Sequence, residues 1–302
     1  MAYLLVQHLD PLHESFLTEI LAKKTAIEVE TATDGATIES DHLYVIPPNV
    51  TMIVAHGVLR LRSREVGDRP YKPVIRSLAE QHEHRAIAVV LSGTDSDGAQ
   101  GLEEAKAAGG ITMAQEPETA KFDGMPKSAI ATGCVDFVMP SKELGKELVR
   151  IGRHRYLNSD TPPDGLAQAE DSLKRIFRLL QGRNGTDFSH YKQTTVHRRL
   201  ARRMALRQVD GVAEYADLLI QYPDKVQALA RDFLIRVTGF FRDLETFAGL
   251  SETVFPALFE QRLAKDPIRV WVAGCASGEE AYSIAMVLLE YLGDRACAYQ
   301  KL

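Results

Sequence analysis

Cysteine is scarce in this sequence, and long hydrophobic runs are missing. The three cysteines, Cys134, Cys275 and Cys297, lie far apart, with no CxxC pair and no histidine at ligand spacing. This argues against a disulfide framework and a zinc site, and a reducing cytoplasm fits it best. No apolar run approaches the roughly 18–20 residues of a membrane-spanning helix, and no signal-peptide pattern occurs. We therefore expect a cytoplasmic protein with no metal and no membrane insertion.

The sequence also lacks an excess of positive charge. Its 302 residues carry a formal net charge of −5, so nothing attracts the whole molecule to nucleic acid or anionic lipid. The composition, 45% hydrophobic and 25% charged, is that of an ordinary globular protein. At about 150 residues per domain, the length predicts two domains, each able to bury a core.

The first half alternates between strand-like and helix-like segments. Strands are expected at residues 1–8, 43–46, 51–61 (around a turn at His56-Gly57), 86–91 and 111–114, and helices at 15–24 and 98–107. This alternation predicts a parallel α/β sheet. Residues 153–169 contain Pro162-Pro163 and few core candidates, which indicates a linker. Residues 170–235 have an almost wholly helical pattern.

Residues 268–290 are the most informative segment. A strand is expected at 268–273, followed by a small-residue turn at 274–278 and an amphipathic helix at 281–289. A backbone without bulky side chains can approach a nucleoside or phosphate ligand, and a helix N-terminus offers it free N–H groups. Such turns also occur where a helix merely packs closely on a sheet. A second strand, turn and helix at 89–101 carries acidic residues, so the two turns suggest two catalytic domains.

Longer strings resemble two known families. VQHLDP (6–11), LSGTDSDGAQG (91–101) and FDGMPKSAIATGCVDFVMP (122–140) resemble CheB-type chemoreceptor glutamate methylesterases. DFSHYKQTTVHRRLARRM (187–204), VTGFFRD (237–243) and VWVAGCASGEEAYSIA (270–285) resemble CheR-type chemoreceptor glutamate methyltransferases. The chain as a whole is similar to the esterase–transferase fusions of bacterial chemosensory systems. The resemblance implies a methylesterase domain at 1–152, a linker at 153–169, a helical receptor-docking domain at 170–235 and a Rossmann-like S-adenosylmethionine-binding domain at 236–302.

The candidate catalytic residues of the first half are His8 and Asp97, each of which follows an expected strand. They would lie on one edge of the sheet, where open α/β sheets place catalytic groups, and Asp95 is the alternative carboxylate. The resemblance implies that His8 is the general base and that Asp97 holds its tautomer. Taken alone, a histidine at a strand end is more often structural, and either aspartate could cap the following helix.

A nucleophile for this pair is not found. The family's serine lies in a glycine-rich turn before the histidine strand, and no GxSxG-like turn occurs in the sequence. Ser15, Ser92 and Ser96 lack the strand-to-helix elbow that activates a hydroxyl. The second strand of a nucleotide-binding βαβ unit would also fall after residue 302. We therefore expect a fragment truncated at both ends and impaired in both activities.

In the second half, the resemblance implies that Thr238, Arg242, Gly274 and Glu280 bind S-adenosylmethionine. Arg242 suits a bidentate contact with the carboxylate of the methionine moiety. Glu279 and Glu280 also fit a simpler role, as favourable charges at a helix N-terminus.

Residues 192–207 carry six lysines and arginines and no acidic residue. By their three-and-four spacing, four arginines share one helical face that we expect to point away from the core: Arg198, Arg199, Arg202 and Arg203. The resemblance implies that this face docks on the acidic, glutamate-bearing helices of a chemoreceptor. A plain solvated face is an alternative, and so is nucleic-acid binding, although no aromatic residues interleave the arginines.

The expected function is therefore the demethylation and methylation of chemoreceptor glutamates, with S-adenosylmethionine as methyl donor. The rival expectation is a non-catalytic scaffold that keeps only the receptor-binding surfaces.

Overall fold

The protein is described by a computed structural model that covers residues 1–9, 15–64, 70–158, 169–234, 240–241, 244–260, 268–275 and 278–293, apart from the side chains of Asp97, Arg155 and Asn158. The chain divides into two compact units, Met1–Ile235 and Arg236–Leu302, and each is treated separately below. No helix among the described residues is long and apolar enough to cross a membrane.

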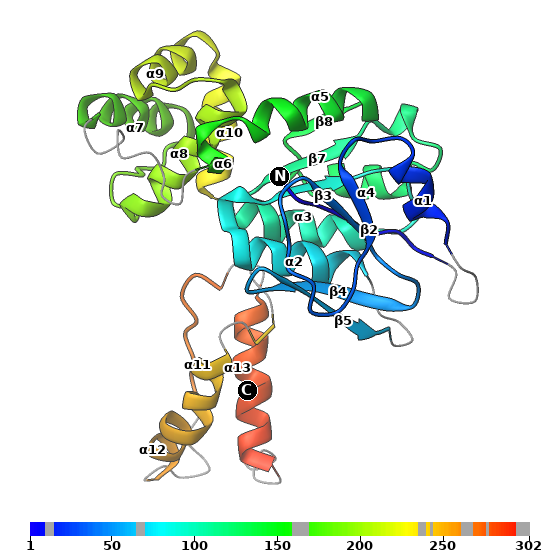
Figure 1. The fold of residues 1–302 in the computed structure, drawn as a ribbon. Coiled ribbons are helices and arrows are strands. Elements are labelled where there is room, and N and C mark those ends of the chain that lie inside the picture. The colour runs from blue at the N-terminus through cyan, green and yellow to red at the C-terminus, as the bar shows by residue number, and fades with distance from the viewer. Residues whose placement is uncertain are drawn as a thin grey trace. The chain divides into compact units, whose positions relative to one another are not determined.

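The first unit begins with a small parallel sheet and a hairpin (Figure 1). The sheet has the order β1 (Tyr3–Leu5), β3 (His42–Val45), β2 (Glu28–Thr31), and the short helix α1 (Leu17–Ala22) precedes β2. The antiparallel hairpin pairs β4 (Val50–Ala55) with β5 (Val58–Ser63). Its turn at His56 and Gly57 has positive φ at both residues, 51° and 74°, as a two-residue hairpin turn requires. The predicted turn is confirmed.

A second parallel sheet has the order β6 (Ile87–Val90), β7 (Ile111–Gln115), β8 (Phe137–Met139). The helices around it are α2 (Tyr71–His82), α3 (Asp97–Ala107), α4 (Gly124–Ala131) and α5 (Ser141–Gly152). Alternate residues of β6 face opposite layers: Ala88 and Val90 pack with α2, α3 and α4, while Ile87 and Val89 pack against a larger core that includes α5. Both faces of the sheet are therefore covered, which confirms the expected α/β class.

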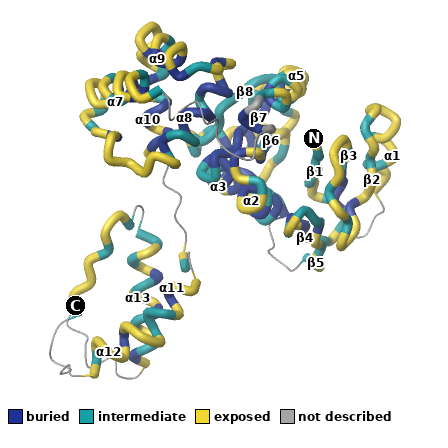
Figure 2. The backbone as a smooth tube through the Cα atoms, turned by 60° about the vertical axis from the view of Figure 1, so that its left-hand side comes forward, coloured by how far each residue is buried: buried dark blue, intermediate teal, exposed yellow. Residues whose placement is uncertain are grey.

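The larger core continues without interruption into a group of helices. These are α6 (Arg155–Asn158), α7 (Glu170–Asn184), α8 (Gln193–Arg207), α9 (Val212–Gln221) and α10 (Pro223–Phe233). Ile111 and Met113 of β7 belong to the same buried cluster as Leu200 of α8 and Leu229 of α10. Figure 2 shows the buried residues of α8 and α10 among these helices. The helical segment is thus packed onto the sheet domain and shares its core.

The second unit contains α11 (Leu244–Gly249), a π-helical turn (Leu250–Val254), α12 (Phe255–Phe259) and α13 (Glu279–Leu292). Phe247, Phe255 and Val287 form its buried centre. The strand expected at residues 268–273 is not formed, and Trp271 within it is 92% exposed. A strand needs a neighbour for its backbone N–H and C=O groups, and no described residue pairs with this segment.

The contact between α2 and α3 yields a prediction about two glycines. A Cβ at Gly101 of α3 would lie 2.9 Å from both Cβ and Cδ1 of Ile75, whereas a Cβ at Gly145 of α5 would meet nothing within 4 Å. Gly101→Ala should therefore lower the free energy of unfolding by about 1–3 kcal/mol through overpacking. Gly145→Ala, the control, should raise it by about 0.5–1 kcal/mol because alanine favours the helix. Urea denaturation measures both, and equal effects would contradict the described packing.

Candidate functional site

His8 lies exposed, three residues beyond the end of β1. Both terminal nitrogens of Arg64 are 3.3 Å from its Nδ1 atom. A guanidinium group only donates hydrogen bonds, so Nδ1 must be the acceptor and the neutral ring carries its proton on Nε2. A histidine that takes a proton from a hydroxyl through Nε2 needs the opposite tautomer, with Nδ1–H donating to a carboxylate. In this structure Arg64 occupies the side of the ring where that carboxylate would lie.

The turn that follows β6 is held by a set of hydrogen bonds. The backbone N–H of Ser92 donates to Oε1 of Gln115 at 3.0 Å, and Oγ of Ser92 accepts from the N–H of Phe122 at 2.9 Å. Gly93 exchanges two backbone hydrogen bonds with Phe122 and Met125, at 3.0 and 2.8 Å. A Cβ at Gly93 would lie 2.2 Å from Sδ of Met125, so a larger residue there would have to displace that side chain. These contacts fix the backbone that leads to Asp95 and Asp97.

The structure does not bring His8 and Asp97 onto one sheet. β1 belongs to the sheet with β3 and β2, and β6 belongs to the sheet with β7 and β8, so the expectation of a shared sheet edge is wrong for the described strands. Asp97 is the first residue of α3, but its side chain lies outside the described residues. The carboxylate of Asp95 accepts from the N–H of Ser96 at 2.6 Å. The pairing of His8 with an aspartate therefore stays a prediction.

Two glycines of the turn before α13 lie among the described residues. Gly274 and Gly278 both have positive φ, 72° and 106°, and a Cβ at Gly274 would meet nothing within 4 Å. Gly278 is the N-cap, and Glu279 and Glu280 lie in the first helical turn. The first four N–H groups of a helix have no partner within it. The turn thus offers an open backbone and a helix N-terminus to a ligand.

A buried serine joins this turn to the segment that contains Thr238 and Arg242. The backbone N–H of Phe241 donates to Oγ of Ser283 at 2.9 Å, and that hydroxyl donates to the carbonyl of Glu279 at 2.7 Å. Ser283 has no exposed surface. Thr238 and Arg242 themselves lie outside the described residues. The open turn, its helix N-terminus and the adjoining backbone of Phe241 fit a nucleoside cofactor such as S-adenosylmethionine.

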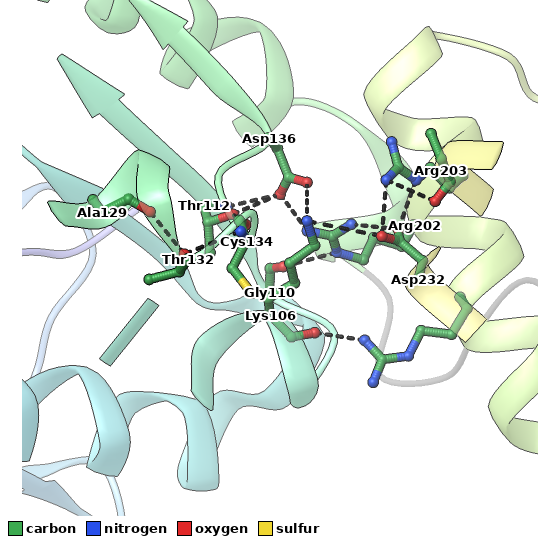
Figure 3. A network of polar contacts seen from close by, with 12 residues as sticks. Lys106, Gly110, Thr112, Ala129, Thr132, Cys134, Asp136, Arg202, Arg203 and Asp232 are labelled. Carbon is green, nitrogen blue, oxygen red and sulfur yellow. Dashed lines mark hydrogen bonds and ion pairs between the residues drawn. The ribbon is translucent and has the colours of Figure 1, made fainter. Parts of the chain in front are cut away.

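The arginines of α8 do not form the solvated face that their spacing suggested. Arg202 is completely buried and Arg199 is 5% exposed. Arg202 donates from Nε to the carbonyl of Gly110 at 2.9 Å, from Nη1 to Asp232 at 2.8 Å, and from Nη2 to Asp136 (Figure 3). Because Asp136 and Gly110 belong to the sheet domain, this side chain points into the junction with that domain. The expectation of an exposed arginine face is wrong for Arg199 and Arg202.

The remaining arginines surround the same junction. Arg199 donates to the carbonyls of Lys106 and Ala107, at 2.5 and 2.6 Å. Arg203 forms a two-pronged contact with Asp232 of α10, at 2.6 and 2.8 Å. Cδ of Arg198 would lie 3.3 Å from a Cβ at Gly109, so the stem of this side chain covers the loop after α3. Whether α8 binds a receptor is untested and stays a prediction.

Burial and neighbouring opposite charges shift the pKa values of Arg202 and Asp232 in opposite directions. Burial alone would lower the pKa of Arg202, but Asp136 and Asp232 raise it above the ordinary arginine value. Burial would raise the pKa of Asp232, and Arg202 and Arg203 lower it instead. For Arg199, burial and its arginine neighbours lower the pKa to about 10. At neutral pH these groups are therefore charged, and each depends on its partners to remain so in the interior.

Comparison with known protein families gives three consecutive matches. Residues 1–148 match the CheB methylesterase model, residues 171–234 match the all-alpha domain of CheR methyltransferases, and residues 236–300 match the SAM binding domain of CheR methyltransferases.

Individual relatives agree with these matches. An uncharacterized 104.1 kDa protein of the hypE 3′ region in Rhodobacter capsulatus is 37% identical over 297 residues, which is 91% of this chain and 31% of that protein. A protein-glutamate methylesterase/protein-glutamine glutaminase of Pyrococcus horikoshii is 36% identical over 50% of this chain and 46% of its own length. A putative protein of the same name in Leptospira interrogans is 32% identical over 50% of this chain and 80% of its own length. The chain thus spans less than half of the first two relatives.

The buried carboxylate of Asp232 predicts a stability loss in acid. Its folded pKa lies below the ordinary value of about 3.9, so its contribution is fully present above that pH and is lost as the pH falls through the lower, folded pKa. Asp232→Asn should lower the free energy of unfolding at pH 7 by about 3–5 kcal/mol, because it leaves buried arginines short of a partner. Between pH 6 and pH 3 the variant should lose less stability than the wild type.

Denaturant titrations at several pH values measure this difference. Asp224→Asn is the control, because Asp224 forms an exposed, solvent-screened pair with Lys225 on the same helix and should change the pH dependence much less than Asp232→Asn does. A wild type and an Asp232→Asn variant with parallel pH profiles would contradict the assignment.

Proposed function

Because the chain belongs to the CheB methylesterase family in its first half and to the CheR methyltransferase family in its second, we propose that it acts on chemoreceptor glutamates in both directions. The first domain would hydrolyse glutamyl methyl esters to glutamate and methanol. The second would form these esters from S-adenosylmethionine. We propose domain limits at 1–152, 170–235 and 236–302, with a linker at 153–169 whose first part forms α6 and packs Tyr156 and Leu157 into the core.

In the esterase half, His8 is proposed as the general base and Asp97 as the carboxylate that orients it. For this role the proton on the ring must move from Nε2 to Nδ1, and Arg64 must leave Nδ1 so that the carboxylate can accept from it. The hydrogen bonds of Gln115 and Met125 support the role of the 92–98 turn, because they hold the backbone that carries Asp97.

In the transferase half, Thr238, Arg242, Gly274 and Glu280 are proposed to hold the cofactor. S-adenosylmethionine supplies the methyl group when it is bound. Gly274 keeps the turn open to the nucleoside, and Arg242 would hold the methionine carboxylate through two parallel hydrogen bonds. The observation that carries the proposal is the contact between Phe241 and Ser283 at 2.9 Å. It draws together the two segments that the cofactor needs, although some forty residues separate them.

The proposed partner is the acidic, glutamate-bearing helical region of a chemoreceptor. The alternatives are a scaffold without catalysis and a nucleic-acid-binding module. Nucleic-acid binding is disfavoured because no aromatic residues interleave the arginines of α8. The scaffold differs from the enzyme in one measurable respect, which is methyl turnover.

Hydrolysis is tested with a methylated chemoreceptor fragment as substrate. We expect these 302 residues to release no methanol, because they contain no GxSxG-like elbow. A chimera that carries the corresponding upstream segment of the Rhodobacter capsulatus relative before residue 1 should release it. In that chimera His8→Ala should lower kcat/KM on the order of 10⁴-fold, since the hydroxyl loses its base.

His56→Asn is the matched control for His8→Ala, because His56 is an exposed hairpin residue. Its methanol release should equal that of the unchanged chimera. Turnover by the 302 residues alone, abolished by His8→Ala, would show that one of their own hydroxyls is the nucleophile. An active His8→Ala chimera would remove His8 from the mechanism.

Cofactor binding is tested by calorimetry with S-adenosylhomocysteine. Binding to the 302 residues should be weak or undetectable, and a chimera that adds the relative's segment following residue 302 should bind it. In this chimera Arg242→Ala should weaken binding roughly 10–100-fold, the loss expected for a hydrogen bond between charged groups. Arg242→Lys should recover only part of it, because lysine cannot form the two-pronged contact. Arg269→Ala, at an exposed site near the turn, is the control. Unchanged binding in Arg242→Ala would show that the carboxylate contact is wrongly assigned.

A further inference from the structure

The end of α3, the loop before β7 and Asp136 just before β8 present hydrogen-bond acceptors to α8. The buried ammonium of Lys106 lies among them, 3.3 Å from Asp136 and 3.8 Å from Asp232. The carbonyls of Lys106, Ala107 and Gly110 each accept from an arginine of α8. The last carbonyls of a helix have no partner within it and lie at the negative end of its dipole, so they attract cations. Asp136, with a side chain 1% exposed, adds a full negative charge beside them. The N–H of Thr112 donates to this carboxylate at 3.0 Å and holds it in place.

The arginines of α8 that contact this surface are held in place by their own partners. Arg202 reaches it between Asp136 on the sheet side and Asp232 on the helical side, as Figure 3 shows. Arg203 also contacts Asp232, which fixes that carboxylate against α8. Arg199 lies one turn before Arg203 and meets the end of α3. Arg202 and Arg203 lie three and four residues after Arg199, so the three share one face of α8, and each of them finds an acceptor at this junction.

Apolar packing accompanies the polar contacts. Ile111 and Met113 of the sheet domain share a buried cluster with Leu200 and Met204 of α8. Tyr156, 1% exposed, donates from its hydroxyl to the carbonyl of Gly109 and closes the edge of the junction. Ion pairs surrounded by apolar contacts keep water away, which distinguishes this junction from a chance meeting of surface charges.

We infer that this face of the methylesterase domain is a docking surface for the basic helix α8, and that it competes with an acidic helical partner for Arg199, Arg202 and Arg203. The second part rests on the proposed function, because it takes the partner to be a chemoreceptor helix. The esterase domain and the receptor would then bind the same arginines, one at a time. Methyl transfer would require α8 to leave the esterase domain.

The docking is tested in the full chain with a specific protease site inserted between Pro162 and Pro163. After cleavage, the two wild-type pieces should remain together in size-exclusion chromatography at micromolar concentration. Asp136→Asn should weaken their association at least tenfold. Arg199→Met should also weaken it, and it leaves no buried charge without a partner if the first variant folds poorly. Arg207→Gln, an exposed position on the same helix, is the matched control and should associate as the wild type does. Separation of the wild-type pieces, or unchanged association in both variants, would overturn the docking surface.

The competition is tested with uncleaved chains and a chemoreceptor cytoplasmic fragment that carries the glutamate helices. Asp136→Asn should bind the fragment at least tenfold more tightly than the wild type, and adding Arg202→Met should remove this gain. Equal binding by the wild type and Asp136→Asn would overturn the competition while leaving the receptor partner in place. Binding by neither, with the cleaved pieces still associated, would overturn the receptor partner of the proposed function and support the docking surface alone.

Discussion

The first unit depends on one guanidinium group that has no contact with water. A buried ion costs several kcal/mol in lost hydration, and only closely placed opposite charges and hydrogen bonds offset this cost. Arg202 has both, from Asp136, Asp232 and the carbonyl of Gly110. Loss of either aspartate leaves a charge buried without compensation. The sheet domain and the helical domain are therefore joined by a contact that tolerates little displacement, because Arg202 pairs with one aspartate from each domain.

This junction lies between the domains that carry the two proposed activities. The helical domain belongs by family to the methyltransferase, yet its core continues into the methylesterase sheet through Ile111 and Met113. The segment that binds the cofactor forms a compact unit of its own. If α8 docks on a receptor as proposed, its contact with the esterase domain would place the two proposed chemistries under a single constraint, since access to one would depend on the state of the other. Such coupling would be a property of the fused chain, because separate enzymes would not share the Arg202 contact.

The sequence predicted individual helices well. It did not predict which segments pack against one another. Helix α8 was expected at residues 192–207 and spans Gln193–Arg207, because spacing alone determines which residues share a helical face. Whether that face meets water or another domain depends on residues such as Asp136, which lies about sixty positions away. The periodicity of α8 contains no information about such distant residues. One signal was available: Asp232 interrupts the apolar stripe of α10 between Leu229 and Phe233, and a lone carboxylate in such a stripe needs a buried cation. The same limit explains why the strand at 268–273 was wrong, since pairing is a property of two segments.

The histidine shows how far the residues alone constrain a mechanism. His8 was expected to receive a carboxylate at Nδ1, and the structure places the donor Arg64 there. An imidazole has two nitrogens with one proton between them when neutral, so the partner on one side determines what the other side can do. With Arg64 on Nδ1, Nε2 can only donate, and a hydroxyl in front of it would keep its proton. With Asp97 on Nδ1, Nε2 would accept, and the same hydroxyl would become a nucleophile. The proposed esterase chemistry would thus depend on which charged side chain reaches Nδ1 of His8, and not on the presence of the histidine alone.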